Sequence, residues 1–308
     1  MKRPEIDFMG KRKIFAIGSL IFVLAALGDI LFQGLNLGLD FTGGTLVEVQ
    51  FREAQDPVEV RQYLESVGYE GGVVQYFGSE RDLLVRMPPQ QDTAQAEMGD
   101  EILDALGALD PGVELLQSNY VGPAVGEELR DDAGLALIAA LGAVMLYILF
   151  RFTKQFAVGA VVALAHDVIV VVGCFSLFQW TFDLPVLAAV LAVVGYSLND
   201  TIVVSDRIRE NFRLIRKATP IEVINRSLNQ TLGRTLVTSL TTLLVLLALL
   251  IAGGETIRGF ATALTIGVVV GTYSSIYVAA NVLVAMNISR EDLLVPEKEG
   301  EEAETEAP

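Results

Sequence analysis

The feature that most constrains this chain is a set of six mostly apolar runs of about 17 to 26 residues each. A helix needs about 20 apolar residues to cross the roughly 30 Å of hydrocarbon in a bilayer. The sequence therefore predicts an α-helical membrane protein with six transmembrane helices. The predicted spans are residues 14–33, 134–150, 156–178, 184–204, 235–252 and 260–285.

The first run has one alternative interpretation, a cleaved secretory signal. Lys11, Arg12 and Lys13 precede it, and Ala26-Leu27-Gly28 offers a small-x-small site. The apolar run continues past that site to Phe32, which is longer than a signal needs. We therefore expect an uncleaved membrane anchor.

Composition excludes several other classes of protein. The net charge of −16 argues against a nucleic-acid binder, which needs a basic surface. One cysteine rules out a disulfide scaffold within the chain, and one histidine argues against a multi-histidine metal site. We expect no metal and no organic cofactor.

The distribution of basic residues predicts the topology. Five Lys and Arg precede the first span and seven lie between Arg207 and Arg234, whereas segment 36–132 carries five bases and twenty acids. Basic residues collect on the cytoplasmic side of membrane proteins. Residues 1–13 and the acidic tail 286–308 are therefore expected in the cytoplasm, the tail as a solvated end, with segment 36–132 outside.

The outer segment 36–132 has the pattern of one compact α+β domain. Alternating apolar residues predict its strands, and a helix opens at Asp56-Pro57 and ends at Gly68. The order strand, helix, strand, strand, helix, strand is the ferredoxin-like pattern. The predicted strands are 46–51, 73–77, 83–87 and 113–118, and the second helix is 92–109. With no His and no Cys, the domain is interpreted as a handle or clamp, not a catalyst.

Ionisable residues inside a span are the first candidates for function, because burying them in hydrocarbon is unfavourable. Counted along their helices, Asp200 in the fourth span and Arg234 in the fifth lie at similar depth. Asn199 accompanies the acid, and Thr238 shares a helix face with the arginine. Burial and a nearby guanidinium act oppositely on a carboxyl group, which suits reversible proton binding. A static ion pair, or an arginine that reaches the membrane surface, remains the alternative.

Three further polar residues need an explanation. His166 and Asp167 lie midway along the third span. They form either a proton relay or a structural site in which His166 makes a hydrogen bond to another helix. Adjacent helical residues point about 100° apart, so we expect the two not to share a face. Asp29 is interpreted as an interfacial carboxylate, and Cys174 as a small buried apolar residue.

Two segments are interpreted as structural. Within the predicted cytoplasmic segment 206–232, basic residues alternate with an apolar stripe, which indicates an amphipathic helix lying on the membrane surface. A capping box at Thr219 and Glu222 indicates the start of a second helix. In the sixth span, Gly267 and Gly271 are spaced as a packing face for another helix.

Three motifs carry a family resemblance over nearly the whole chain, apart from the acidic tail. They are Gly38–Gly44 (GLDFTGG), Gly195–Glu210 (GYSLNDTIVVSDRIRE) and Leu232–Ser239 (LGRTLVTS). Together they resemble the SecD/SecF protein-export membrane proteins. The single short outer domain and the Asn-Asp form of the second motif resemble the SecF branch more than SecD. The signature residues of the first motif are Asp40, Phe41, Thr42, Gly43 and Gly44.

The resemblance implies a function. Members of this family form half of a bundle of the RND type, pair with SecD in the bacterial inner membrane and dock on the SecYEG channel. With YajC as a further partner, they use the proton-motive force to complete export of preproteins after the ATP-driven step of SecA. The resemblance also assigns the proton path to Asp200 and Arg234. We expect protonation of Asp200 to weaken its pairing with Arg234 and tilt the outer domain against an emerging polypeptide.

Two rival functions stay open at this point. One is a half-transporter that exports lipids or small molecules, and the other is a passive assembly factor of the translocon. An intramembrane aspartyl protease fits less well, because Asp167 and Asp200 lack the Tyr-Asp and Gly-x-Gly-Asp settings of that family. No ATP-binding loop motif is present in the sequence, and we expect no enzymatic activity.

Overall fold

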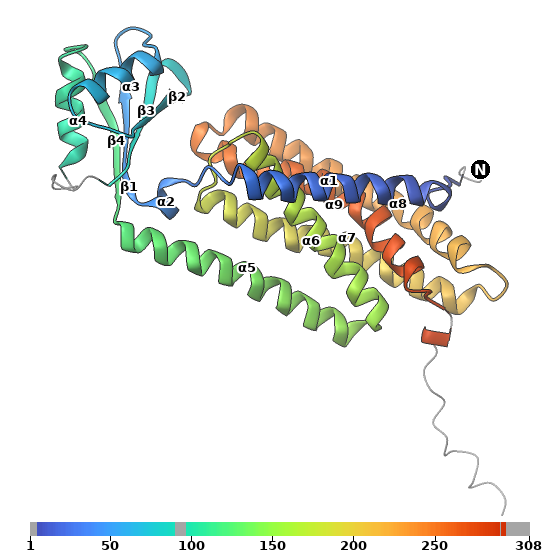
Figure 1. The fold of residues 1–308 in the computed structure, drawn as a ribbon. Helices are drawn as coiled ribbons and strands as arrows, with labels where there is room; N and C mark the ends of the chain where they lie inside the picture. Colours follow the sequence, from blue (N-terminus) through green and yellow to red (C-terminus); the bar gives the residue numbers. More distant parts are fainter. Residues whose placement is uncertain (1–4, 90–96, 290, 294–308) are drawn as a thin grey trace, which may run out of the picture.

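The computed structural model describes residues 5–89, 97–289 and 291–293, and combines six long helices with a small sheet domain at one end of the helical bundle (Figure 1). Each long helix is apolar and long enough to cross a membrane. The prediction of six spans and one α+β domain is confirmed. The long helices are α1 (Arg12–Phe32), α5 (Pro123–Arg151), α6 (Lys154–Leu177), α7 (Leu184–Leu214), α8 (Pro220–Ala252) and α9 (Glu255–Ala285). There are also three short helical elements: η1 (Met9–Lys11) before α1, α2 (Leu39–Thr42) between α1 and the sheet domain, and η2 (Glu291–Leu293) after α9.

The sheet domain has the predicted element order. Its elements are β1 (Gly44–Gln50), α3 (Pro57–Ser66), β2 (Val73–Phe77), β3 (Ser79–Met87), α4 (Met98–Gly107) and β4 (Glu114–Val121). The antiparallel strands lie in the order β2-β3-β1-β4. One sheet face packs on both helices, with fully buried Val47, Val85, Val60 and Ile102 in the shared core. The predicted helix 92–109 corresponds to α4 over its described part, and residues 92–96 lie outside the described residues.

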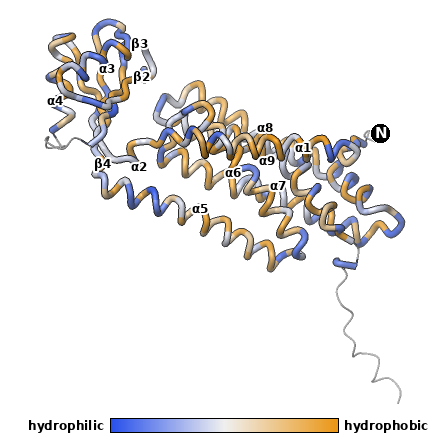
Figure 2. The backbone as a smooth tube through the Cα atoms, in the orientation of Figure 1, coloured by the Kyte–Doolittle hydropathy of each residue, from blue (hydrophilic) through white to orange (hydrophobic). Residues whose placement is uncertain are grey.

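Helix α6 lies at the centre of the bundle. Of its most apolar 18 residues 61% are buried, against 6% in α1 and in α5. Large apolar side chains are exposed along both outer helices, α1 and α5. The hydropathy colouring marks much of the length of these helices as hydrophobic (Figure 2). Helix α5 begins eleven residues before the predicted span, at Pro123, and its first turns are hydrophilic. These turns extend α5 toward the sheet domain.

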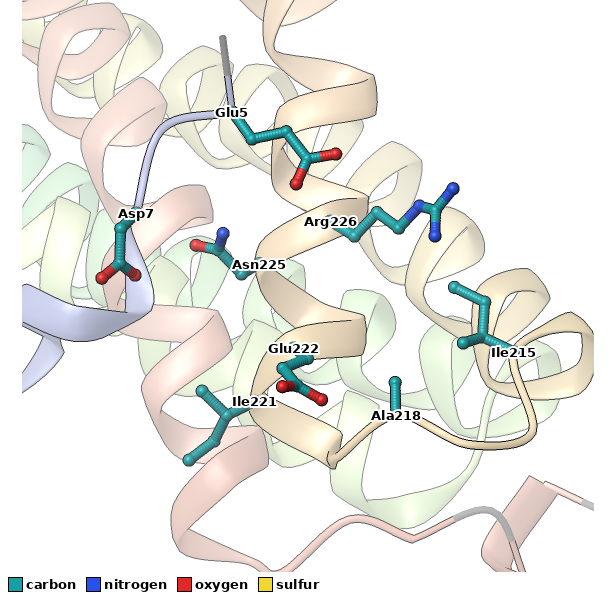
Figure 3. A pocket seen from close by; sticks show the side chains of 8 residues that line it. All are labelled: Glu5, Asp7, Ile215, Ala218, Ile221, Glu222, Asn225 and Arg226. Carbon is teal, nitrogen blue, oxygen red and sulfur yellow. The ribbon is translucent and has the colours of Figure 1, made fainter.

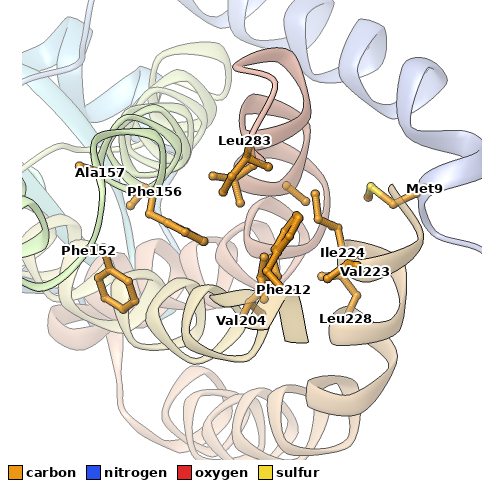
Figure 4. Packing of buried hydrophobic residues seen from close by; sticks show 14 of the residues in the cluster. Met9, Phe152, Phe156, Ala157, Val204, Phe212, Val223, Ile224, Leu228 and Leu283 are labelled. Carbon is orange, nitrogen blue, oxygen red and sulfur yellow. The ribbon is translucent and has the colours of Figure 1, made fainter. Parts of the chain in front are cut away.

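The amphipathic segment 206–232 differs from the prediction. Helix α7 continues to Leu214 and α8 already begins at Pro220, so no separate helix lies on the membrane surface. The apolar stripe packs instead against protein: Ile208 and Phe212 are buried in a cluster with Phe156, Ile224 and neighbouring residues (Figure 4). A stripe that faces lipid and one that faces another helix have the same period, which explains the error.

The start of α8 matches the sequence in detail. Thr219 Oγ1 accepts a hydrogen bond from the backbone N–H of Glu222, and the Glu222 carboxylate accepts one from the backbone N–H of Thr219. This reciprocal pair is a capping box, and Pro220 occupies the first position of the helix. The sequence signal for this helix start is therefore confirmed.

Helices α7 and α9 approach closely at two glycines. A Cβ on Gly267 would lie 2.0 Å from Val193 Cγ2, and one on Gly271 would lie 3.0 Å from Ser197 Cβ. An added Cβ at position 267 would therefore force Val193 to shift, and one at position 271 would make a tight contact with Ser197. By contrast, a Cβ on Gly195 of α7 would meet nothing within 4 Å.

We predict that Gly267→Ala destabilises the bundle by about 1–3 kcal/mol, because an added methyl group in a close-packed contact forces the helices apart. Gly195→Ala is the matched control and should be neutral or slightly stabilising, since alanine favours helix over glycine. Thermal unfolding of the two variants in detergent measures the difference. Equal midpoints would contradict the close packing of α7 on α9.

Candidate functional site

Asp200 lies in the middle of α7 and is almost fully buried, with 3% of its surface exposed. Its Oδ2 atom has no hydrogen-bond partner among the described residues. A buried carboxylate oxygen without a partner is energetically unfavourable and is a common mark of a functional group. Asp200 is therefore the first candidate.

The expected direct pairing with Arg234 is not present. Arg234 lies on the exposed side of α8 and, across the described residues, makes no ion pair within 4.0 Å. It acts on Asp200 only by a longer-range Coulomb attraction. The buried stripe of α8 contains Thr231, Thr235 and Ser239, and Arg234 is one residue, or about 100°, away from it. The prediction compared only the depth of the two residues along their helices. It could not give the rotation of α8 about its axis, which turns Arg234 away from Asp200.

Two threonines next to this pair resemble Asp200 in one respect. The Oγ1 atoms of Thr201 and Thr235 are buried and also lack a hydrogen-bond partner in the described part of the chain. They lie on α7 and α8, which pack against each other. Unpartnered oxygens thus lie next to both members of the predicted pair in sequence.

The other predicted members of the site lie elsewhere. Asn199 is exposed on α7, and Thr238 Oγ1 donates within its own helix to the carbonyls of Arg234 and Thr235, at 3.0 and 2.9 Å. Among the described residues, neither Asn199 nor Thr238 forms a hydrogen bond with the Asp200 carboxylate. We retain Asp200 as the centre of the site.

Asp167 of α6 joins three helices. Its Oδ2 atom accepts hydrogen bonds from Ser197 Oγ of α7 at 2.5 Å and from Ser274 Oγ of α9 at 2.7 Å. Its Oδ1 atom lies 2.9 Å from His166 Nδ1. The side chain is completely buried, and three donors satisfy it. This Asp167 cluster, defined here as Asp167, His166, Ser197 and Ser274, holds α6, α7 and α9 together.

The contact between His166 and Asp167 corrects the expectation that the two residues do not share a face. Their Cβ atoms point apart, but rotation about the side-chain bonds brings the imidazole to the carboxylate, within one helix rather than across two. The His166 ring lies beside Tyr273, with 6.1 Å between ring centroids. Tyr273 in turn hydrogen-bonds to α1: its hydroxyl donates to the carbonyl of Phe15 and also forms a hydrogen bond of 2.6 Å with the hydroxyl of Ser19.

Sequence reasoning missed the two serines of the Asp167 cluster. Ser274 is not among the candidates singled out from the sequence, and Ser197 is included only as part of the motif Gly195–Glu210. A usable signal was present: Ser197 lies one turn before Asp200, and Ser274 follows Gly271 by three residues on the face that packs on α7. Small hydroxyl side chains on a glycine-rich helix contact are typical donors to buried polar groups in membranes.

The three remaining candidates lie on other elements than Asp200. Asp29 is half-buried near the end of α1, and its Oδ2 atom has no partner among the described residues. Cys174 is half-buried and has a free thiol. Asp40 of the GLDFTGG motif accepts a hydrogen bond from the backbone N–H of Leu184, the first residue of α7, at 2.9 Å. Within the described ranges, no group of three or more His, Cys, Asp or Glu residues is arranged to hold a metal ion.

Comparison with known proteins decides the family. The family model for the C-terminal part of the protein export membrane proteins SecD and SecF matches residues 101–289, and the model for the SecD/SecF GG motif matches residues 30–55. The chain belongs to the SecD/SecF family of protein-export membrane proteins. The glycine pair of that second motif corresponds to Gly43 and Gly44.

Relatives cover the chain almost end to end. The protein translocase subunit SecF of Pseudomonas aeruginosa is 52% identical over 96% of each chain. The SecF of Escherichia coli O157:H7 is 44% identical and covers 97% of this chain and 94% of its own length. The crystal structure of SecDF from Thermus thermophilus aligns with a TM-score of 0.84 and 43% identity, over 92% of this chain. This chain spans only 39% of that SecDF chain.

We predict that the Asp167 cluster stabilises the bundle through charged hydrogen bonds. Ser274→Ala should lower the free energy of unfolding by about 1.5–3 kcal/mol, because it removes a bond to a buried carboxylate. Ser275→Ala is the matched control: Ser275 is equally buried but donates to the carbonyl of Thr272 in its own helix. Chemical unfolding in detergent measures both variants, and equal losses would contradict the prediction.

Proposed function

We propose that this chain is the SecF-type subunit of the protein-export machinery and that it couples proton movement to translocation. Membership of the SecD/SecF family supports the export role. The single observation that carries the coupling is Asp200, a buried carboxylate that has an unpartnered oxygen and no direct counterion among the described residues. Such a group favours the protonated form when the site is closed to water, and the charged form when water or a cation reaches it.

Helix α7 places Asp200 next to the contact between α6, α7 and α9. Asp200 lies one turn after Ser197, which is bonded to the Asp167 cluster, so a change in charge at Asp200 acts next to the contact that holds α6, α7 and α9. One proton that moves through a potential of 100 mV supplies about 2.3 kcal/mol. That is comparable to the strength of one or two buried hydrogen bonds, so a few protons suffice to shift the packing.

The comparisons also support movement. The SecDF crystal structure in its super-membrane-facing form matches with 42% identity over 93% of this chain, but its TM-score is 0.70 rather than 0.84. The identity and coverage of the two matches are nearly equal, so the difference reflects the arrangement of the parts. A fold that takes more than one arrangement is what a coupled export subunit requires.

The proposal includes partners and an orientation. A SecD partner is supported by the SecDF chain of Thermus thermophilus, of which this chain covers only a fraction, and by the free apolar faces of α1 and α5. The family resemblance extends the proposal to the SecYEG channel, to YajC and indirectly to SecA, with exported preproteins as substrates and protons as the coupling ion. We place the chain in the bacterial inner membrane, with both termini in the cytoplasm and the sheet domain outside.

The rival functions receive less support. A pocket of about 290 Å³ lies between the N-terminal segment and the start of α8, at the end of the bundle away from the sheet domain (Figure 3). Its lining includes the charged side chains of Glu5, Asp7, Glu222 and Arg226, which do not suit a lipid. A passive assembly factor has no need for an unpartnered carboxylate in the membrane.

The test is gradient-driven export in vesicles that carry the full complex. Asp200→Asn keeps the shape of the side chain but removes its charge, so the gradient-dependent part of export should fall about tenfold or more, as is usual when a proton-transfer group is lost. Export without a gradient should stay unchanged. Asp131→Asn, at a side chain that is 82% exposed on α5, is the control for loss of charge alone.

The opposite outcome is equally informative. If Asp200→Asn assembles with its partner and exports with full gradient dependence, Asp200 is a structural residue. The chain is then a passive assembly factor.

A further inference from the structure

The GLDFTGG motif lies at a junction that the proposed proton chemistry does not use. It forms α2 between the end of α1 and the start of β1, beside the start of α7 (Figure 1). Phe41 of the motif is buried in the same cluster as Phe182 and Val186. The motif therefore connects the sheet domain to the helix that carries Asp200.

On the side of the bundle, three hydrogen bonds fasten this segment to the start of α7. Asp40 Oδ2 accepts from the backbone N–H of Leu184 at 2.9 Å. The backbone N–H of Gly38 donates to the carbonyl of Phe182 at 2.7 Å, and that of Phe182 donates to the carbonyl of Asn36 at 2.8 Å. Of the three, only the Asp40 bond reaches α7 itself.

On the side of the sheet domain, the backbone of the motif packs closely against β3. Gly43 and Gly44 have φ angles of 67° and 121°, which favour glycine. A Cβ on Gly44 would lie 2.3 Å from the carbonyl oxygen of Met87 in β3. Arg86 of β3 also donates to the carbonyl of Leu37 at 2.7 Å and to Asn36 Oδ1 at 3.0 Å. The segment thus forms hydrogen bonds to the sheet domain as well as to the bundle.

We propose that Asp40 is a positioning residue that transmits displacement of α7 to the sheet domain. This inference rests on the proposed function. Helix α7 runs without interruption from Leu184 to Leu214, and Asp200 lies roughly 24 Å along it from the bond to Asp40. A continuous helix moves as one body over this distance. Movement at Asp200 therefore reaches Leu184, and the bond to Asp40 passes it through Gly43 and Gly44 to β1.

Asp183 provides a matched control. It also accepts a hydrogen bond at the start of α7, from the backbone N–H of Val186 at 2.9 Å, but within the helix itself. Asp183→Ala removes a cap of similar strength without touching the bond between Asp40 and Leu184. Any effect of Asp40→Ala that exceeds that of Asp183→Ala comes from the connection and not from the capping of α7.

The experiment measures domain movement and export in the full chain assembled with its partner. Cys174 is replaced by Ala, and spin labels are placed on the exposed residues Val58 of α3 and Leu177 of α6. Distance distributions are recorded with Asp200 and with Asp200→Asn, which imitates the protonated acid. We expect Asp200→Asn to shift the distribution in the parent chain and in Asp183→Ala, but not in Asp40→Ala.

Two further variants separate the bond from overall stability. Asp40→Asn keeps an oxygen that accepts from Leu184 and should retain the shift. Leu184→Pro removes the donor and places proline at the first position of a helix, where it is tolerated, so it should lose the shift as Asp40→Ala does. Gradient-dependent export should fall about fivefold in both variants that lose the bond, the factor that corresponds to a helix-cap hydrogen bond of about 1 kcal/mol.

Three results would overturn the inference: a shift that persists in Asp40→Ala, equal losses in Asp40→Ala and Asp183→Ala, or an Asp40→Asn variant as defective as Asp40→Ala. The proposed function fails separately, when Asp200→Asn exports normally. If Asp200→Asn loses gradient-dependent export but shifts no distance in the parent chain, the proposed function stands and the role of Asp40 is wrong.

Discussion

A carboxylate buried inside a membrane bundle has to be satisfied by its neighbours, and in this chain Asp167 imposes that requirement on three helices. Ser197 and Ser274 reach it from α7 and α9, and His166 reaches it from its own helix. In hydrocarbon no water replaces a missing donor, so these bonds fix the rotation of each helix about its axis. The close glycine contacts of α9 on α7 depend on the same alignment, because Gly271 lies against Ser197.

Asp200 differs from Asp167 in the one property that matters for function. Both carboxylates are buried, but Asp167 has three donors, whereas one oxygen of Asp200 has none in the described structure. A buried carboxylate whose oxygens are all hydrogen-bonded suits a structural role. An oxygen without a partner leaves Asp200 free for the role proposed above. The two carboxylates lie on neighbouring helices, and Ser197, which bonds to Asp167, lies one turn before Asp200.

The long helix α7 brings these features into one mechanical element. It carries Ser197 and Asp200 in its middle, continues to Leu214 beyond the predicted span, and begins at the residue that bonds to Asp40. The sheet domain is attached to this end of the bundle through a short and tightly packed segment. The start of α7 and the sheet domain are therefore connected through hydrogen bonds of the segment that contains Asp40.

Local sequence patterns were enough to predict the six spans, the order of elements in the sheet domain and the capping box at Thr219, and to select Asp200 as a candidate. Each follows from local periodicity, from a turn signal, or from the cost of a charge in hydrocarbon. The folded structure was needed to show which faces meet. It showed that the stripe at Ile208 and Phe212 packs on protein, that Arg234 lies outside the buried stripe of α8, and that Ser197 and Ser274 converge on Asp167. Helical spacing gives the depth and relative angle of residues within one helix, but the rotation of each helix against the others depends on contacts between residues far apart in the chain.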